Sequence, residues 1–167
     1  MDIRLVIPTV FQHPVKGIGK ESHEKQACGL GLVSVGGPDN KERSDKIAAA
    51  RKGPTLNLCG KPLRWPAAIL RRSKMFIGGD GGMMHLAASQ GVPCIAAFSA
   101  RDLPGAMVPF GEGHKVLYHR TPCFGCKVWE CTEHDKKCIR AITPGEAIAA
   151  AWKKIGERTG QPAGEDS

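Results

Sequence analysis

Residues 76–99, FIGGDGGMMHLAASQGVPCIAAFS, constrain the fold of this chain more than any other stretch. An apolar run ends in a glycine-rich turn, an apolar helix-like segment follows, and a second apolar run closes the stretch. The two runs predict buried strands, and the segment between them predicts a helix. A strand, a helix and a strand in this order are typical of a parallel sheet, because parallel neighbours need a long crossover connection.

The same alternation extends along most of the chain. Strands are expected at 3–7, 30–35, 55–58, 74–77, 93–98 and 115–119, and helices at 41–51, 64–72, 83–90 and from Thr143 onward. Single helices between strands predict an α/β fold with a Rossmann-like, doubly wound parallel sheet. Thr143 and Glu146 have the spacing of a capping box, with a proline at the first helical position.

Apolar positions indicate which faces of these helices meet the sheet. They are Ile47, Ala48 and Ala50 in the first helix, Trp65, Ile69 and Leu70 in the second, and Ala147, Ile148, Ala151, Trp152 and Ile155 in the last.

The length of 167 residues suits one globular domain and is too short for two ordinary ones. We expect this domain over residues 1–155, with a cysteine-rich loop at 123–138 inside it and a flexible tail at 156–167. The glycine- and lysine-rich segment 11–26 has no clear periodicity.

Charge and hydropathy limit the partners and the compartment. A net charge of +8 favours phosphates, nucleic acid or an anionic membrane surface. No segment approaches the run of about 18 to 20 apolar residues that spans a bilayer, and Met1 is followed by Asp2 rather than by an export signal. We expect a cytoplasmic protein, with peripheral contact at the anionic inner face of the inner membrane as a further expectation.

The glycine-rich turn is the first candidate site. Ligands of a doubly wound sheet bind beyond the carboxyl ends of its strands, which is where this turn is expected. The free amides of Gly82, Met83 and Met84 would begin a helix and favour a phosphate. We expect Asp80 to cap that helix or to bond a sugar hydroxyl, and His85 to donate to a phosphate oxygen. Taken alone, the turn fits an ordinary capped strand-to-helix connection at least as well.

The turn belongs to a larger pattern. Residues 80–88, DGGMMHLAA, with Gly91-Val92-Pro93 and Phe98 after them, resemble the signature of glycosyltransferase family 9, whose pattern is close to D-S/T-G-x-M/S-H-L-A-A. These are the heptosyltransferase-like enzymes of lipopolysaccharide assembly. The turn at 35–38, the element at 58–60 and the stretch 138–143 fit the same pattern, so the resemblance covers residues from about 30 to 155.

The resemblance implies one half of a GT-B architecture, the nucleotide-sugar-binding domain. It implies transfer of a sugar from a nucleoside diphosphate sugar such as ADP-heptose to a lipopolysaccharide or other glycan acceptor, with no metal cofactor required for the transfer. The residues it assigns to the donor and its diphosphate are Asp80, Gly81, Gly82, Met83, Met84 and His85.

Further candidates lie at other expected strand ends. They are Gly36, Gly37 and Asp39 for the nucleoside, and Ser99 and Arg101 for a phosphate. Asp39 is equally well explained as an ordinary turn former before a helix.

Two departures from the family pattern change what we expect. Gly81 stands where the family has Ser or Thr, so a hydroxyl that could contact the diphosphate is missing. The family's N-terminal domain, which carries the acceptor surface and the expected general base, has no counterpart in this sequence. We therefore expect the chain alone to bind nucleotide weakly, to transfer no sugar, and to seek the missing domain or a second copy of itself.

Four of the seven cysteines form a second constellation, Cys123-x2-Cys126-x4-Cys131-x6-Cys138. Four thiols this close in sequence fit a structural zinc site, which would brace the loop before the last helix. A disulfide pair is the competing interpretation, disfavoured in a reducing compartment. The other three cysteines are expected to pack in the core: Cys28, Cys59 and Cys94.

Two other functions remain open. A basic zinc-binding module that binds nucleic acid would use the +8 charge and the cysteines, but aromatic residues for base stacking make up only 5% of the chain. A dinucleotide-dependent oxidoreductase is less well supported, because residues 28–31, CGLG, precede an expected strand, whereas the fingerprint follows one.

Overall fold

The structure, a computed structural model, describes residues 5–6 and 31–159. Its strands are β1 (Leu5–Val6), β2 (Leu32–Ser34), β3 (Thr55–Asn57), β4 (Phe76–Gly79), β5 (Cys94–Phe98) and β6 (Lys115–Tyr118). Its helices are the short 3-10 helix η2 (Pro38–Asn40), α2 (Lys41–Ala50), α3 (Arg64–Leu70), α4 (Gly82–Ser89), α5 (Lys137–Arg140) and α6 (Pro144–Thr159). The segment 11–26, Cys28, most of the strand expected at 3–7 and the chain beyond residue 159 lie outside the described residues.

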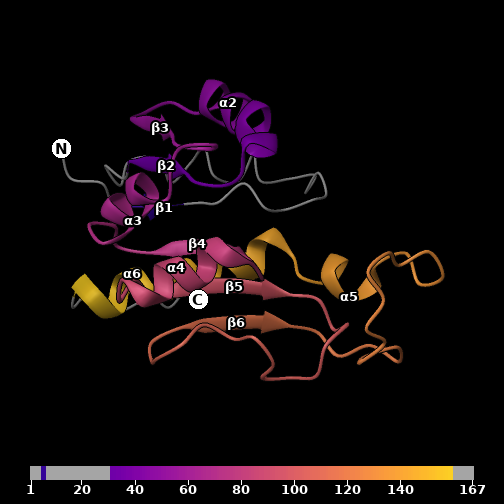
Figure 1. Ribbon diagram of the computed structural model, residues 1–167. Helices are drawn as coiled ribbons and strands as arrows, with labels where there is room; N and C mark the ends of the chain where they lie inside the picture. Colours follow the sequence, from indigo (N-terminus) through magenta and orange to yellow (C-terminus); the bar gives the residue numbers. More distant parts are fainter. Residues whose placement is uncertain (1–4, 7–30, 160–167) are drawn as a thin grey trace.

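The described strands form one parallel sheet in the order β3-β2-β1-β4-β5-β6 (Figure 1). The chain builds outward from β1 to β3 on one side and from β4 to β6 on the other, so the strand order reverses between β1 and β4. Such a reversal defines a doubly wound sheet and marks where its ligands bind. The predicted fold class is confirmed.

Strand β5 shows how both faces of the sheet are covered. Cys94, Ala96 and Phe98 belong to a core cluster that includes Met84 and Ala87 of α4. Its other two residues, Ile95 and Ala97, belong to a second cluster against which Ala147, Ala151 and Ile155 of α6 pack. In Figure 1, α4 lies in front of this part of the sheet and α6 behind it. A strand buried on both faces is apolar throughout, which explains the continuous run CIAAF.

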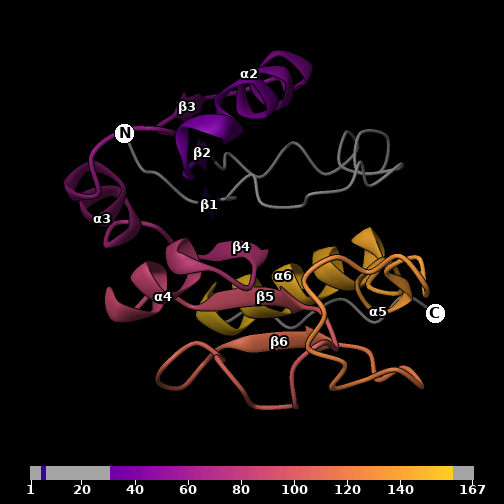
Figure 2. The same cartoon turned by 45° about the vertical axis from the view of Figure 1, so that its right-hand side comes forward.

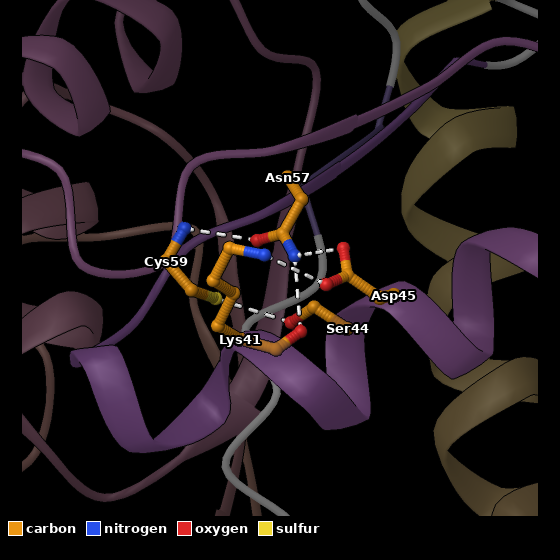
Figure 3. A network of polar contacts seen from close by, with 5 residues as sticks. All are labelled: Lys41, Ser44, Asp45, Asn57 and Cys59. Carbon is orange, nitrogen blue, oxygen red and sulfur yellow. Dashed lines mark hydrogen bonds and ion pairs between the residues drawn. The ribbon is translucent and has the colours of Figure 1, made fainter.

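The face of α2 that meets the sheet differs from the predicted one. Ser44 is the buried residue of this helix, whereas Ile47 is 38% exposed and Ala50 is exposed. Polar contacts fix the face instead: the Asn57 side chain donates to the Lys41 carbonyl (3.1 Å) and to Asp45 Oδ1 (2.7 Å), as Figure 3 shows. One isoleucine and three alanines give too weak an apolar stripe to compete with these bonds.

The predicted inward stripe of α3 is also partly wrong. Leu70 is fully buried, together with Pro66 in the first turn, but Trp65 is 54% exposed. Pro66 is accepted there because the first turn of a helix needs no amide at that position.

The last helix begins as predicted and ends later. Thr143 Oγ1 accepts a hydrogen bond from the amide of Glu146 (3.2 Å), which is one half of the capping box. The helix continues to Thr159, so it runs four residues past the boundary expected at residue 155. None of the helices in the described part of the chain combines the length and the apolar character needed to cross a lipid bilayer.

Candidate functional site

A pocket of about 240 Å³ lies where β4 turns into α4, beside the reversal of strand order. It is lined by Gly36, Gly37, Phe76, Gly79, Asp80, Gly81, Gly82, Met83 and Met84. Two segments predicted to bind parts of one ligand, 36–37 and 80–84, therefore meet in space. Phe76 and Gly79 also line the pocket, and no sequence signal beyond their place in the strand pointed to them.

The wall formed by α4 offers backbone amides. Among the described residues, the amides of Gly81, Gly82 and Met83 have no hydrogen-bond acceptor. The amide of Met84, also expected to be free, instead donates to the Gly81 carbonyl at 3.0 Å. Unpaired amides at the start of a helix, with the positive end of its dipole, form an environment that favours an anion.

The glycines of this turn keep the space in front of those amides open. Gly81 has φ 163°, an extended conformation that any residue adopts, so the turn itself does not require glycine there. A Cβ added at Gly81 or Gly82 would meet no atom within 4 Å. The two glycines therefore leave open space at the part of the pocket that they line.

Asp80 does not cap α4, so the predicted capping role is wrong. The N-cap residue is Gly81, and no side chain caps this helix. The Asp80 amide donates to the Ala97 carbonyl at 3.2 Å, which ties the turn to β5. Partial burial raises the pKa of the Asp80 carboxyl, as does the nearby Asp102 carboxylate, while His85 and Arg101 act in the opposite direction. With no capping role, the carboxylate is available to a ligand.

His85 lies one turn into α4 and is not among the residues that line the pocket. Its Nε2 atom is buried and has no hydrogen-bond partner within the described part of the chain. Buried polar atoms are normally paired, so this unpaired ring nitrogen, on the same helix as the pocket-lining Gly82, Met83 and Met84, is a candidate contact for a ligand atom or a water molecule.

The opposite wall is the connection from β2 to α2. The amides of Gly36 and Gly37 have no acceptor among the described residues, while the Gly36 carbonyl accepts from the Gly60 amide at 2.9 Å. Asp39, predicted to join them, is exposed in η2 and does not line the pocket.

Ser99 and Arg101 follow β5 and do not line the pocket either. Arg101 Nε donates to Asp102 Oδ2 at 2.9 Å, and its guanidinium carbon lies 4.0 Å from the centre of the Trp129 ring. Trp129 belongs to the cysteine-rich loop, whose Gly125 amide donates to the Ala100 carbonyl (2.7 Å). These contacts fasten the loop to the carboxyl end of β5, where it appears in orange in Figure 2.

The cysteines of this loop are free thiols. In the part of the chain that the structure describes, no three His, Cys, Asp or Glu side chains are close enough together to hold a metal ion. The predicted grouping of Cys123, Cys126, Cys131 and Cys138 around one zinc ion is therefore not assembled here. Cys59 and Cys94 are buried as predicted, and burial raises the pKa of the Cys94 thiol to about 12.

The fold and the pocket define a doubly wound α/β domain with a candidate ligand site at the reversal of its strand order. The family model "Glycosyltransferase family 9 (heptosyltransferase)" matches residues 21–137, which is more than half of the chain. The chain belongs to this family. No curated protein sequence matches it significantly.

Three solved structures are similar in fold. A family 9 glycosyl transferase from Veillonella parvula DSM 2008 is 23% identical, with a TM-score of 0.77, over 93% of this chain and 46% of its own. E. coli ADP-heptose lps heptosyltransferase II is 18% identical, with a TM-score of 0.65, over 95% and 48%. The dodecameric, iron-containing heptosyltransferase TibC, solved in complex with ADP-D-beta-D-heptose, is 18% identical, with a TM-score of 0.68, over 98% and 48%. The chain thus spans about half the length of these structures.

Proposed function

We propose that this chain is the donor-binding half of a glycosyltransferase that takes a sugar from a nucleoside diphosphate sugar. The observation that carries the proposal is the pocket between the two walls of unpaired amides, Gly36–Gly37 and Gly81–Met83. A diphosphate is the part of such a donor that matches them, because backbone amides and a helix N-terminus both favour an anion. TibC is described as a complex with ADP-D-beta-D-heptose, so ADP is the nucleotide to test first.

The chemistry of transfer explains why these groups are useful. When the bond between the sugar and the diphosphate breaks, negative charge builds on the departing diphosphate. Preorganised donors stabilise that charge, and we assign this role to the amides of Gly82 and Met83, with the His85 ring as a further donor. Asp80 would accept a hydrogen bond from a hydroxyl of the donor sugar.

Transfer also needs an acceptor and a base, which we place outside this chain. We propose a lipopolysaccharide or other glycan as the acceptor, in line with the name of E. coli ADP-heptose lps heptosyltransferase II. Large apolar side chains are exposed in the loops that follow β5 and β6, among them Leu103, Met107, Phe110 and Trp129. We propose that a second Rossmann-like domain, or another copy of the chain, covers them and completes the cleft.

A thermal-shift comparison tests this function directly. A ligand of the folded state raises the midpoint of unfolding, so ADP should raise it more than UDP or NAD, and a short oligonucleotide should have no effect. A response to the oligonucleotide alone would reject the proposal in favour of nucleic-acid binding.

Structural zinc on the four cysteines of the 123–138 loop stays a separate proposal. Their spacing supports it, although the thiols are not drawn together in the structure. The metal would brace the loop and would take no part in transfer. TibC is described as iron-containing, so iron should be measured together with zinc.

A further inference from the structure

The position of the Gly36–Gly37 wall depends on a polar network outside the pocket. Figure 3 shows its members on α2 and at the end of β3: Lys41, Ser44, Asp45, Asn57 and Cys59. The carboxamide of Asn57 is its centre. It donates to the Lys41 carbonyl and to Asp45 Oδ1, and it accepts from the Cys59 amide at 3.0 Å.

The network holds the α2 end of the segment that carries the wall. Asn57 fixes the first turn of α2, which follows Gly36 and Gly37 directly through η2. The buried Ser44 Oγ, 3.1 Å from Cys59 Sγ, joins the same helix to the chain just after β3.

Gly60 connects this anchor to the pocket itself. Its amide donates to the Gly36 carbonyl at 2.9 Å, and the backbone is in the left-handed region with φ 75°. A Cβ added at Gly60 would lie 3.2 Å from Pro38 Cα, closer than side chains normally approach backbone. A larger residue at this position would displace Pro38 by a few tenths of an ångström, and we expect Gly36 and Gly37 to shift with it.

We infer that Asn57 and Gly60 are positioning residues that set the distance between the two amide walls, and so the affinity for a nucleoside diphosphate. Neither residue lines the pocket. The inference rests on the proposed function only for the identity of the ligand, since the mechanical link from Gly60 to Gly36 is independent of what binds.

Gly91 offers a matched control for Gly60. It has nearly the same backbone conformation, φ 71°, but a Cβ added there would meet no atom within 4 Å. Gly60→Ala and Gly91→Ala therefore carry the same cost of a left-handed alanine, and only the first moves the pocket wall.

Calorimetric titration of the 167-residue chain with ADP, together with amide NMR spectra, tests the inference. We expect Gly60→Ala to raise the Kd for ADP at least tenfold and to shift the Gly36 and Gly37 amide resonances, while Gly91→Ala changes neither. An unchanged Kd and unchanged resonances in Gly60→Ala would overturn the inference. If the unaltered chain fails to bind ADP, the proposed function fails, and the resonance shifts alone decide the positioning role.

Variants of Asn57 give a second, independent measurement. Asn57→Asp removes both donors and places a carboxylate against Asp45, so ADP affinity should fall as in Gly60→Ala. The double variant Asn57→Asp with Asp45→Asn reverses the donor and acceptor of that pair and should recover part of the affinity. Equal affinities for the single and the double variant would contradict the role of the Asn57–Asp45 bond.

Discussion

Glu146 Oε2 lies 2.8 Å from His119 Nε2, and this contact joins the first turn of α6 to the residue that follows β6. The sequence pattern placed the Glu146 carboxylate in a capping box with Thr143. The structure uses the threonine hydroxyl as a cap and turns the carboxylate toward the neighbouring strand instead. The Glu146 side chain thereby links α6 to the end of β6.

Removing the cap should destabilise the domain by a predictable amount. We expect Thr143→Ala to lower the free energy of unfolding by about 1 kcal/mol, because the Glu146 amide loses its acceptor. Ser89→Ala is a suitable control, since the Ser89 hydroxyl contacts the Leu86 carbonyl at the end of α4 and caps no amide. Urea unfolding of both variants measures the difference, and equal losses would show that the cap contributes nothing special.

Filling the space in front of the α4 amides should block the ligand without unfolding the protein. Gly82→Val places a branched side chain where an added Cβ meets no atom within 4 Å, so the fold should tolerate it. We expect the Kd for ADP to rise at least tenfold, with little change in the unfolding midpoint. Gly145→Val, also in the first turn of a helix and with room for a Cβ, is the matched control and should bind ADP normally. Normal binding by the Gly82 variant would place the ligand elsewhere.

Because the pKa of the Asp80 carboxyl is raised in the folded state, its ionised form lowers the free energy of unfolding. Below pH 3.8, the ordinary pKa, the carboxyl is neutral in both the folded and the unfolded state. The loss of stability appears as the pH rises from there through the higher pKa of the folded state. Asp80→Asn should therefore be more stable than the unaltered chain at pH 7, with the gain shrinking to nothing as the pH falls below 3.8.

Asp45 provides the opposite case for the same measurement. Hydrogen bonds from Asn57 and Lys41 lower the pKa of the Asp45 carboxyl, so its ionised form favours folding. Asp45→Asn should lose stability at pH 7, and this loss should diminish in acid. Denaturant unfolding between pH 3 and pH 7 compares the two variants, and a destabilised Asp80→Asn at pH 7 would contradict our account of that carboxylate.

Metal content tests the proposal for the cysteine-rich loop. We expect about one zinc ion per chain, released when Cys126 and Cys131 are both replaced by serine, and a lower unfolding midpoint after chelation. Elemental analysis with a thiol titration measures both quantities. No metal, together with four reactive thiols in the native protein, would reject the site.

The isolated chain should not transfer sugar. A transferase must hold donor, acceptor and base together in a closed cleft, and this positioning lowers the barrier by about 7 kcal/mol or more. Labelled ADP-heptose with a lipopolysaccharide-core acceptor is the assay, using chain shown to be monomeric. Turnover by the monomer would show that this domain alone is sufficient and would overturn the two-domain proposal.

Local sequence determined the elements of this domain well, because their signals lie within a few residues of one another. The continuous apolar run of β5, the glycine turn before α4 and the Thr143 cap all occur where the sequence predicted them. These features depend on burial, on the absence of side chains at the turn and on one local hydrogen bond. Each is encoded by neighbouring residues.

Only the tertiary structure decided which elements meet. Gly36 and Gly37 face the β4–α4 turn because β1 pairs with both β2 and β4, so the ends of β2 and β4 flank the same strand. Local periodicity carries no information about that strand order. The tertiary structure also decided which face of α2 meets the sheet, because the Asn57 carboxamide that fixes this face comes from β3. Contacts between distant residues depend on the order of the strands, and that order is a property of the whole folded chain.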